Sequence, residues 1–339
     1  MIEILRPGAQ SSVQDLGRTG FRRFGVGRSG AADSLALEAG NRLLGNEPGA
    51  AAIEFTLGRA TLRFHADMRV ALTGAECGGN LDGTPVWSWY AFNVRKDQLL
   101  TLPVARGGTR TYLCASGGID VPLVMNSRST DLQSGFGGFE GRALREGDRL
   151  PVGRTGIDGK CEPLGILAPA WSLPFGQSDD IRAIRVLPGP EYDDFEPASQ
   201  AAFWQSAWTL SPQSNRMGLR LQGRALARRP ERSADLLSHG VVPGVLQVPP
   251  SGQPIVLMSD AQTTGGYPKI GVVIGADLWR LAQTPPGDSV RFVQVTLDEA
   301  AAAQATLDHY LRQIDQALHW QGDGMMIAAR RRTRTCSVV

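Results

Sequence analysis

The sequence predicts a mainly β protein with a few helices (α+β), built from β-barrels or β-sandwiches. Turns are frequent, because the chain holds 41 glycines and 21 prolines. The segments between them are short, and many are β-branched or alternate apolar with polar residues, which is typical of strands rather than of repeated βαβ units. The expected strands include residues 61–64, 69–73, 99–104, 110–115, 183–187, 255–258 and 290–295.

Helical signals are few. Asp33 or Ser34 is a suitable N-cap for a helix that runs to Leu44 and is ended by Gly45. A second helix is expected over residues 195–208.

The clearest helix begins at Asp298 and ends near Trp320. Its acidic first turn complements the helix dipole, and apolar residues recur along it at steps of four, three and four. This stripe predicts a helix packed on the rest of the protein. The residues of the stripe are Leu307, Leu311, Ile314 and Leu318.

The length of 339 residues is too great for one ordinary core and favours two domains, or three small ones. The best boundary is the segment 158–180, which is rich in proline, glycine and serine. We therefore expect a first domain over 1–165, a second over 180–297, the helix over 298–321 and a basic, frayed tail over 322–339.

Composition indicates a soluble globular protein. Hydrophobic residues make up 42% and charged residues 20% of the chain, and the formal net charge of +2 does not point to a nucleic-acid surface. No apolar run is long enough to span a membrane, and no signal pattern opens the chain. The scattered cysteines suit reduced thiols, so a cytoplasmic location is expected. They are Cys77, Cys114, Cys161 and Cys336.

Several common motifs are absent or unconvincing. Residues 25–30 match GxGxxG, but they do not follow a buried strand, so a dinucleotide site is not expected. There is no GxxxxGK[ST] loop, no GxSxG elbow and no Met-Lys-Met context for attaching biotin. The four histidines lack the spacing of metal ligands, so no metal site is predicted.

The loop between residues 259 and 274 is the most informative segment. Apolar segments at 255–258 and 270–274 are expected to form strands on either side of it. A plain hairpin needs only its Gly265–Gly266 pair, so the excess of polar side chains suggests a rigid loop that binds a ligand, although local turn bonding is the alternative. Its polar residues are Asp260, Gln262, Thr263, Thr264, Tyr267 and Lys269.

Two further clusters combine polar residues with glycine. The first contains VQDLGR, SGAAD, NRLLGN and IEFT, and the second contains GGIDVP and NSRST. Each alone is compatible with turn chemistry. Three such clusters in one chain favour a ligand-binding or subunit-binding surface.

Together with DAQTTGGYPKIG, these motifs resemble, in the same order, the allophanate-hydrolase-subunit-2-like carboxyltransferase family. The resemblance covers roughly residues 2–295, and one departure is Ala32, where the family pattern SGAMD has methionine. Family members include one subunit of bacterial ATP-dependent 5-oxoprolinase, part of urea carboxylase, and a regulator of a sporulation-kinase inhibitor.

The resemblance implies a fold of two cyclophilin-like β-barrel domains. It also implies ATP-dependent opening of 5-oxo-L-proline to L-glutamate. The implied partners are a B-type companion subunit, also cyclophilin-like, and an A-type subunit of the lactam-utilisation type. ATP is then used by the complex, and this chain alone is expected to be inactive.

Site roles follow from the chemistry of lactam opening. Asp33, Glu54 and Asp120 are candidate general bases or orienting groups, although Asp33 also suits a helix cap and Asp120 a turn. Lys269 is suited to neutralise developing negative charge, and Arg128 to hold a substrate carboxylate. The candidates for hydrogen bonds to the substrate are Gln262, Thr263, Thr264 and Tyr267.

Two other functions remain open. One is the carboxyltransferase component of a biotin-dependent urea- or guanidine-type carboxylase, with biotin on a separate carrier protein. The other is a non-enzymatic regulator that binds a kinase-inhibitor partner. The motifs are shared across all three possibilities, because one fold hosts several functions.

Overall fold

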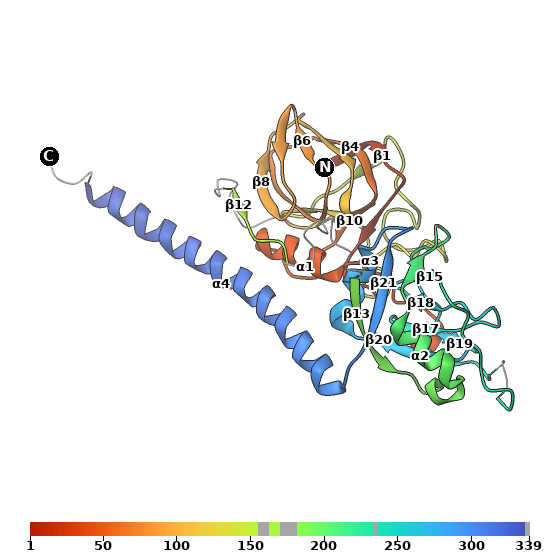
Figure 1. Cartoon of the computed structure of the whole chain (residues 1–339). Helices are drawn as coiled ribbons and strands as arrows, with labels where there is room; N and C mark the ends of the chain where they lie inside the picture. The colour runs from red at the N-terminus through yellow and green to blue at the C-terminus, as the bar shows by residue number, and fades with distance from the viewer. Residues whose placement is uncertain (155–162, 170–181, 233–235, 336–339) are drawn as a thin grey trace.

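A computed structural model describes residues 1–154, 163–169, 182–232 and 236–335, with side chains of the last helix described as far as residue 320. The predicted boundary at 158–180 lies mostly outside these residues. Strands dominate the described chain, which confirms the mainly β fold class, and every strand expected above overlaps an observed one. Figure 1 shows two adjacent bodies with one long helix beside them.

The first domain consists of two six-stranded sheets around one apolar core. Ile4 and Leu62 of one sheet and Ile53 and Leu113 of the other are fully buried in this core. The first sheet holds, in spatial order, β11 (Arg149–Leu150), β1 (Ile2–Pro7), β4 (Gly58–Phe64), β9 (Leu99–Val104), β6 (Gly79–Leu81) and β7 (Thr84–Val86). The second holds β12 (Leu164–Gly165), β8 (Tyr90–Val94), β5 (Met68–Glu76), β10 (Arg106–Ala115), β3 (Ala52–Thr56) and β2 (Gln10–Gln14).

The second domain is a closed barrel of seven strands. Its core is rich in aromatic side chains, with Phe203 stacked on Phe292 at 5.0 Å between ring centroids. The strands, in order around the barrel, are β13 (Arg182–Pro188), β20 (Lys269–Val273), β17 (Val245–Gln247), β18 (Ile255–Leu257), β15 (Gly218–Gln222), β14 (Trp208–Leu210) and β21 (Ser289–Gln294). A separate two-stranded sheet pairs β16 (His239–Gly240) with β19 (Thr264–Gly265).

The helices agree with the sequence in position. Helix α1 (Ser34–Leu43) begins after Asp33, whose carboxylate accepts a hydrogen bond from the Ala36 amide at 2.9 Å. Helix α2 (Pro197–Gln205) is shorter than the expected 195–208, because Phe195 has an extended backbone and Trp208 already belongs to β14. Besides α4, the described residues also form α3 (Leu278–Ala282) and the 3₁₀ turns η1 (Arg22–Phe24), η3 (Tyr192–Asp194) and η4 (Gly275–Asp277).

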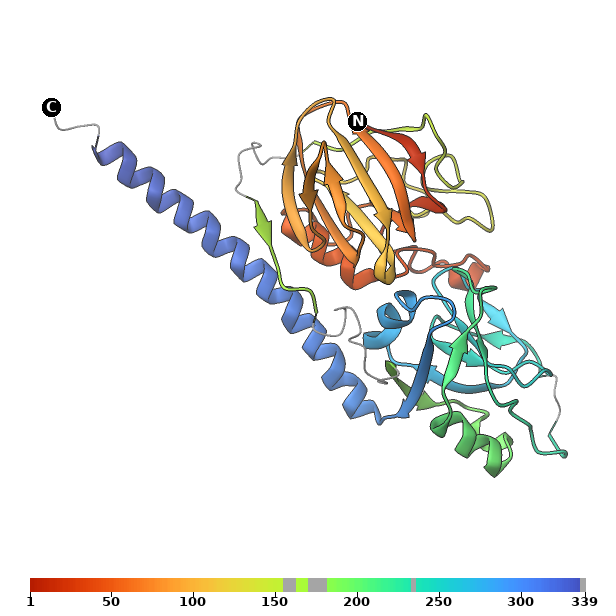
Figure 2. The same ribbon diagram turned by 45° about the horizontal axis from the view of Figure 1, so that its top comes forward.

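Helix α4 (Leu297–Thr335) packs against both domains. It contacts α1 of the first domain and η4 of the second, and Figure 2 shows it running along both bodies and projecting beyond them. The predicted apolar stripe is confirmed, since Leu307, Leu311 and Ile314 are buried and Leu318 packs at the edge of the same cluster. The helix continues to Thr335 instead of ending near Trp320, because no proline interrupts a segment rich in alanine, methionine and arginine.

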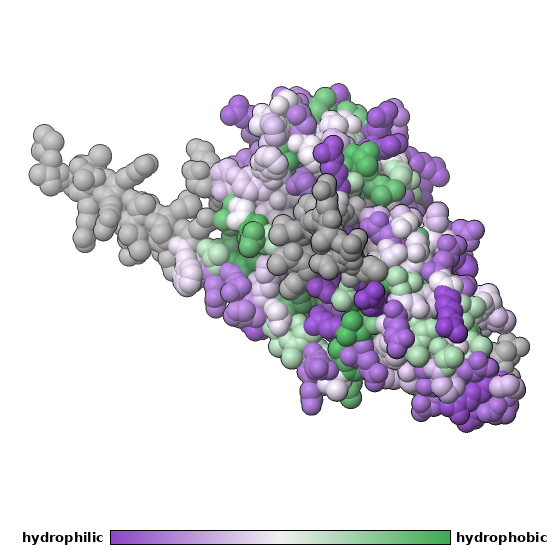
Figure 3. All heavy atoms as spheres, in the orientation of Figure 1, coloured by the Kyte–Doolittle hydropathy of each residue, from purple (hydrophilic) through white to green (hydrophobic). Residues whose placement is uncertain are grey.

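The surface in Figure 3 is largely hydrophilic, with hydrophobic residues in small separate groups. Within the described residues, no helix is both long and apolar enough to cross a membrane.

Candidate functional site

A buried polar network joins the two domains at Glu54, a residue of β3. One carboxylate oxygen of Glu54 accepts hydrogen bonds from the Ala32 amide at 2.9 Å and from the Tyr112 hydroxyl at 2.7 Å. The other accepts from Nη1 of Arg216, in the second domain, at 2.5 Å. Burial alone raises the pKa of Glu54, but the charges of Arg216 and Arg110 outweigh it and hold the pKa below its ordinary value.

Arg216 is the central cation of this network and is only 5% exposed. It lies just before β15 and forms a bidentate pair with Asp260, with Nε–Oδ2 at 2.8 Å and Nη2–Oδ1 at 2.9 Å. Its Nη2 also donates to the carbonyl of Gly30 at 2.6 Å. All three guanidinium nitrogens are therefore bonded, and two carboxylates from different domains share one cation.

Asp33 belongs to the same interface. Besides capping α1, its carboxylate accepts a hydrogen bond from Nε2 of Gln283 at 2.7 Å, and its amide donates to the Tyr112 hydroxyl at 2.8 Å. Burial raises the pKa of Asp33 to about 6. Gln283 in turn accepts from the amides of Thr109 and Arg110 and donates to the Arg110 carbonyl, all at 2.9 Å, so one side chain of the second domain bonds four groups of the first.

Asp120 and Arg128 lie together at the surface, with Nη2 of Arg128 3.1 Å from Oδ1 of Asp120. Their side chains are 35% exposed for Arg128 and 57% for Asp120. The Arg128 amide donates to Asp15 at 2.6 Å, and the Ser127 hydroxyl donates to the same carboxylate at 2.7 Å. The first and second sequence clusters thus meet at Asp15.

The Gln262–Lys269 loop is not a simple hairpin. Strands β18 and β20, which flank it, do not pair with each other; both pair with β17. The loop instead contributes β19, which pairs with β16. From the first domain, Arg22 donates to the carbonyls of Val241 and Gln262 and so ties η1 to this loop.

Lys269 lies at the base of this loop and is 3% exposed. Its Nζ is 3.4 Å from Nδ1 of His239, and burial lowers the pKa of the ammonium group while Glu191 partly opposes that shift. Gln247 is also buried; it accepts from Gln262 and donates to the Tyr267 carbonyl, each at 3.4 Å.

The upper part of the loop faces solvent. Gln262, Thr264 and Tyr267 are exposed, and Thr263 is half-buried. The loop therefore combines exposed polar side chains with the buried amine of Lys269 and the buried amide of Gln247.

The predicted site residues fall into three groups. Asp33 and Glu54 are joined through Tyr112, Asp120 pairs with Arg128, and Lys269 lies under the loop. The sequence did not single out the residues that connect the domains, since no local motif marks them. The residues that connect the domains are Arg110, Arg216 and Gln283. The sequence also did not single out Tyr112, which joins Asp33 to Glu54 within the first domain, or His239 and Gln247, which lie beside the loop.

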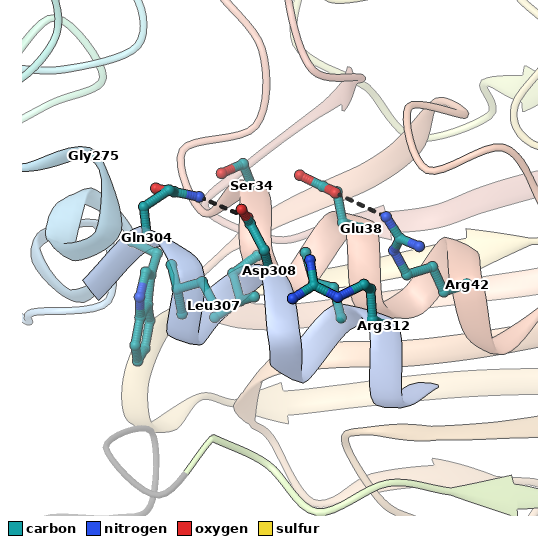
Figure 4. A pocket seen from close by; sticks show the side chains of 11 residues that line it. Ser34, Glu38, Arg42, Gly275, Gln304, Leu307, Asp308 and Arg312 are labelled. Atoms are coloured by element: carbon teal, nitrogen blue, oxygen red, sulfur yellow. Dashed lines mark hydrogen bonds and ion pairs between the residues drawn. The ribbon is translucent and has the colours of Figure 1, made fainter. Parts of the chain in front are cut away.

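A further groove lies between α1 and α4, with a volume of about 290 Å³. Figure 4 shows Glu38 and Arg42 of α1 beside Asp308 and Arg312 of α4. Glu38 and Arg42 form an ion pair at 3.6 Å, and Asp308 accepts a hydrogen bond from Gln304 at 3.0 Å. Across the part of the chain that the structure describes, no group of three or more His, Cys, Asp or Glu side chains is arranged to hold a metal ion.

Residues 24–294 match the model of the carboxyltransferase domain, subdomains A and B. The chain belongs to this family. It is 50% identical to the C-type subunit of 5-oxoprolinase from Escherichia coli, over 94% of this chain and 99% of that protein. It is 46% identical to the corresponding 5-oxoprolinase protein of Haemophilus influenzae, over 93% and 97%.

A solved structure of the same fold is the urea amidolyase of K. lactis. The two superpose with a TM-score of 0.84 at 30% identity, over 92% of this chain but only 20% of the amidolyase. This chain therefore corresponds to one region of a much longer protein in that case, whereas it matches the bacterial 5-oxoprolinase proteins over nearly their whole length.

Proposed function

We propose that this chain is the C-type subunit of an ATP-dependent 5-oxoprolinase, which opens 5-oxo-L-proline to L-glutamate together with an A-type and a B-type subunit. The observation that carries the proposal is the match, at 50% identity and over nearly the full length, to a protein named as that component. ATP is proposed as a cosubstrate of the complex and is not assigned to a site in this chain.

Opening the lactam requires transfer of the terminal phosphoryl group of ATP to its carbonyl oxygen, with ADP released, followed by addition of water at the carbonyl carbon and cleavage of the C–N bond, with a proton delivered to the departing nitrogen. Hydrolysis of the resulting acyl phosphate by a second water then releases phosphate and L-glutamate. We assign Lys269 to stabilise negative charge on the carbonyl oxygen, because its ammonium group is held in a buried position where charge interactions are strong. The loop residues Gln262, Thr263, Thr264 and Tyr267 hold the substrate by hydrogen bonds.

The remaining candidate residues are either exposed at the surface or buried between the domains, and we assign their roles accordingly. Arg128 is proposed to hold the substrate carboxylate and Asp120 to act as the general base, since both are accessible at the surface. Glu54 and Asp33 are proposed as orienting groups, because they are almost completely buried and hydrogen-bonded within the interdomain network.

The test is reconstitution with candidate A-type and B-type subunits. The complete mixture with ATP is expected to release glutamate from 5-oxo-L-proline, and this chain alone is expected to release none. Lys269→Met should lower kcat of the mixture by roughly a hundredfold, the effect of removing one charge-stabilising group. Lys96→Met, at an exposed position, is the matched control. A complete mixture that produces no glutamate contradicts the proposal.

The likeness to urea amidolyase favours one second candidate, the carboxyltransferase component of a biotin-dependent carboxylase. In that case the carboxyl group arrives on a biotin attached to a separate carrier protein. Co-purification with a biotinylated protein, together with carboxylation of urea or guanidine by the purified mixture, would support this candidate over lactam opening.

A further inference from the structure

Strand β16 holds His239 against the Gln262–Lys269 loop. His239 lies opposite Gly265 in the two-stranded sheet, and the Leu236 amide donates to the Gly266 carbonyl at 3.1 Å. A Cβ atom on Gly266 would lie 2.7 Å from the Leu236 carbonyl oxygen, which is closer than side chains approach in real structures. Glycine at this position therefore lets the chain that leads into β16 approach the loop, and the strand pairing fixes the backbone of His239 beside it.

The side chain of His239 is in contact with the buried amine of Lys269. Nζ of Lys269 lies 3.4 Å from Nδ1 of His239. Lys269 is only 3% exposed, whereas His239 is exposed. The imidazole therefore offers the buried amine a hydrogen-bonded route to the surface of the loop.

This contact determines which nitrogen of the neutral imidazole carries the proton. An ammonium group can only donate, so Nδ1 accepts from Lys269 and the ring proton is on Nε2. Nε2 lies on the other side of the ring, where it can meet water or a ligand. Burial lowers the pKa of the Lys269 ammonium group, although the charge of Glu191 opposes the shift, so this group releases a proton more readily than an exposed lysine does.

We propose that His239 is the proton-transfer residue of the loop and carries a proton from Lys269 to the departing nitrogen of the lactam. The assignment rests on the proposed function, in which that nitrogen must gain a proton. As the C–N bond breaks, the proton on Nε2 passes to the nitrogen while Nδ1 takes a proton from the ammonium group. The imidazole remains neutral and Lys269 becomes a neutral amine. A proton from water then enters at Nε2, and the proton on Nδ1 returns to Lys269.

The first test uses the full chain alone and measures by NMR how fast the ammonium protons of Lys269 exchange with water. The chain has three lysines, at positions 96, 160 and 269, so lysine labelled with nitrogen-15 gives few signals, and Lys269→Met identifies the signal of Lys269. His239→Gln retains a hydrogen-bond acceptor but cannot pass a proton on, and His239→Phe retains a ring beside the amine.

Each His239 variant is expected to slow the exchange about tenfold or more, because positioned acid–base groups accelerate proton transfer by larger factors than that. His309→Gln, at an exposed position of α4, is the matched control and should leave the exchange unchanged. Exchange in His239→Phe that is as fast as in the wild-type chain, or faster, would overturn the proposal.

The second test uses the complete reconstituted mixture with ATP. His239→Gln should lower kcat for glutamate release by roughly a hundredfold, and His309→Gln should retain the wild-type value. An unchanged kcat in the mixture that contains His239→Gln would overturn the assignment. A wild-type mixture that releases no glutamate contradicts the proposed function instead, and the exchange rates of the chain alone still decide whether His239 carries the protons of Lys269.

Discussion

Asp33 is a residue at which helix capping and domain contact coincide. Its carboxylate caps α1 and also accepts a hydrogen bond from Gln283 of the second domain. These bonds favour the ionised form, but burial has the larger effect and raises the pKa to about 6. The ionised carboxylate of Asp33 therefore lowers the free energy of unfolding near neutral pH.

The raised pKa of Asp33 makes the free energy of unfolding fall as the pH rises. Between pH 4 and 6 the folded protein holds a proton on Asp33 that the unfolded chain, with an ordinary pKa near 3.8, has released. Because the folded state binds more protons, the stabilising contribution of Asp33 to the free energy of unfolding is fully present below pH 4. It is lost as the pH rises to about 6. The loss is up to about 3 kcal/mol, from roughly two pKa units at 1.36 kcal/mol each.

The measurement compares wild-type protein with Asp33→Asn, whose amide oxygen retains the helix cap. Urea unfolding from pH 4 to 7 is expected to show the variant gaining stability relative to wild type as pH rises, with most of the change below pH 6. Asp67→Asn, at an exposed position, is the control and should give no such change. A constant difference between Asp33→Asn and wild type across this range would contradict the assignment.

At the scale of single elements, α4 shows what an apolar stripe predicts and what it leaves open. The spacing of Leu307, Leu311 and Ile314 predicts a packed helix, and the structure confirms it. The stripe contains no information about which surface it covers. That surface is formed by α1, by Trp89 and by the η4–α3 region with Trp279, which are distant in sequence.

Leu311→Ala is expected to lower the free energy of unfolding by about 2–4 kcal/mol, because it removes a buried side chain and leaves a cavity between α4 and the two domains. Leu297→Ala is the matched control on the same helix, where the leucine is 73% exposed. The control should change stability by less than about 0.5 kcal/mol. Equal effects of the two variants in urea unfolding would show that the stripe does not hold α4 in place.

For the 259–274 loop too, the sequence predicts local structure but not the distant segments that the loop contacts. Glycines, flanking apolar runs and clustered polar residues are local features, so its strands and its exposed polar surface were predictable. The pairing of β19 with β16 and the contact between Lys269 and His239 depend on chain segments about 25 to 30 residues away. No spacing rule links them.

At the scale of the whole molecule, the contacts that hold the domains together could not be predicted from the sequence. Glu54 and Arg216 are 162 positions apart. Nothing local distinguishes Arg216 from Arg220, which is exposed on the next strand. The sequence indicated that Glu54 and Asp260 belong to polar clusters, but only the folded chain shows that both form ion pairs with one guanidinium, that of Arg216. The interface is thus a property of the assembled domains.

This shared cation leads to a prediction for the complete chain. Arg216→Met removes the main counter-charge of two buried carboxylates, so the free energy of unfolding at pH 7 is expected to fall by about 3–5 kcal/mol. Arg220→Met is the matched control and should have little effect. In the variant, Glu54 loses the positive charge that holds its pKa low, and Asp260 loses the charge that partly opposes the rise of its pKa on burial, so protonation relieves the unpaired charges. The deficit relative to wild type should therefore be smaller at pH 5 than at pH 7. A loss below about 1 kcal/mol, or one that does not depend on pH, would mean that Arg216 does not stabilise the interface through these carboxylates.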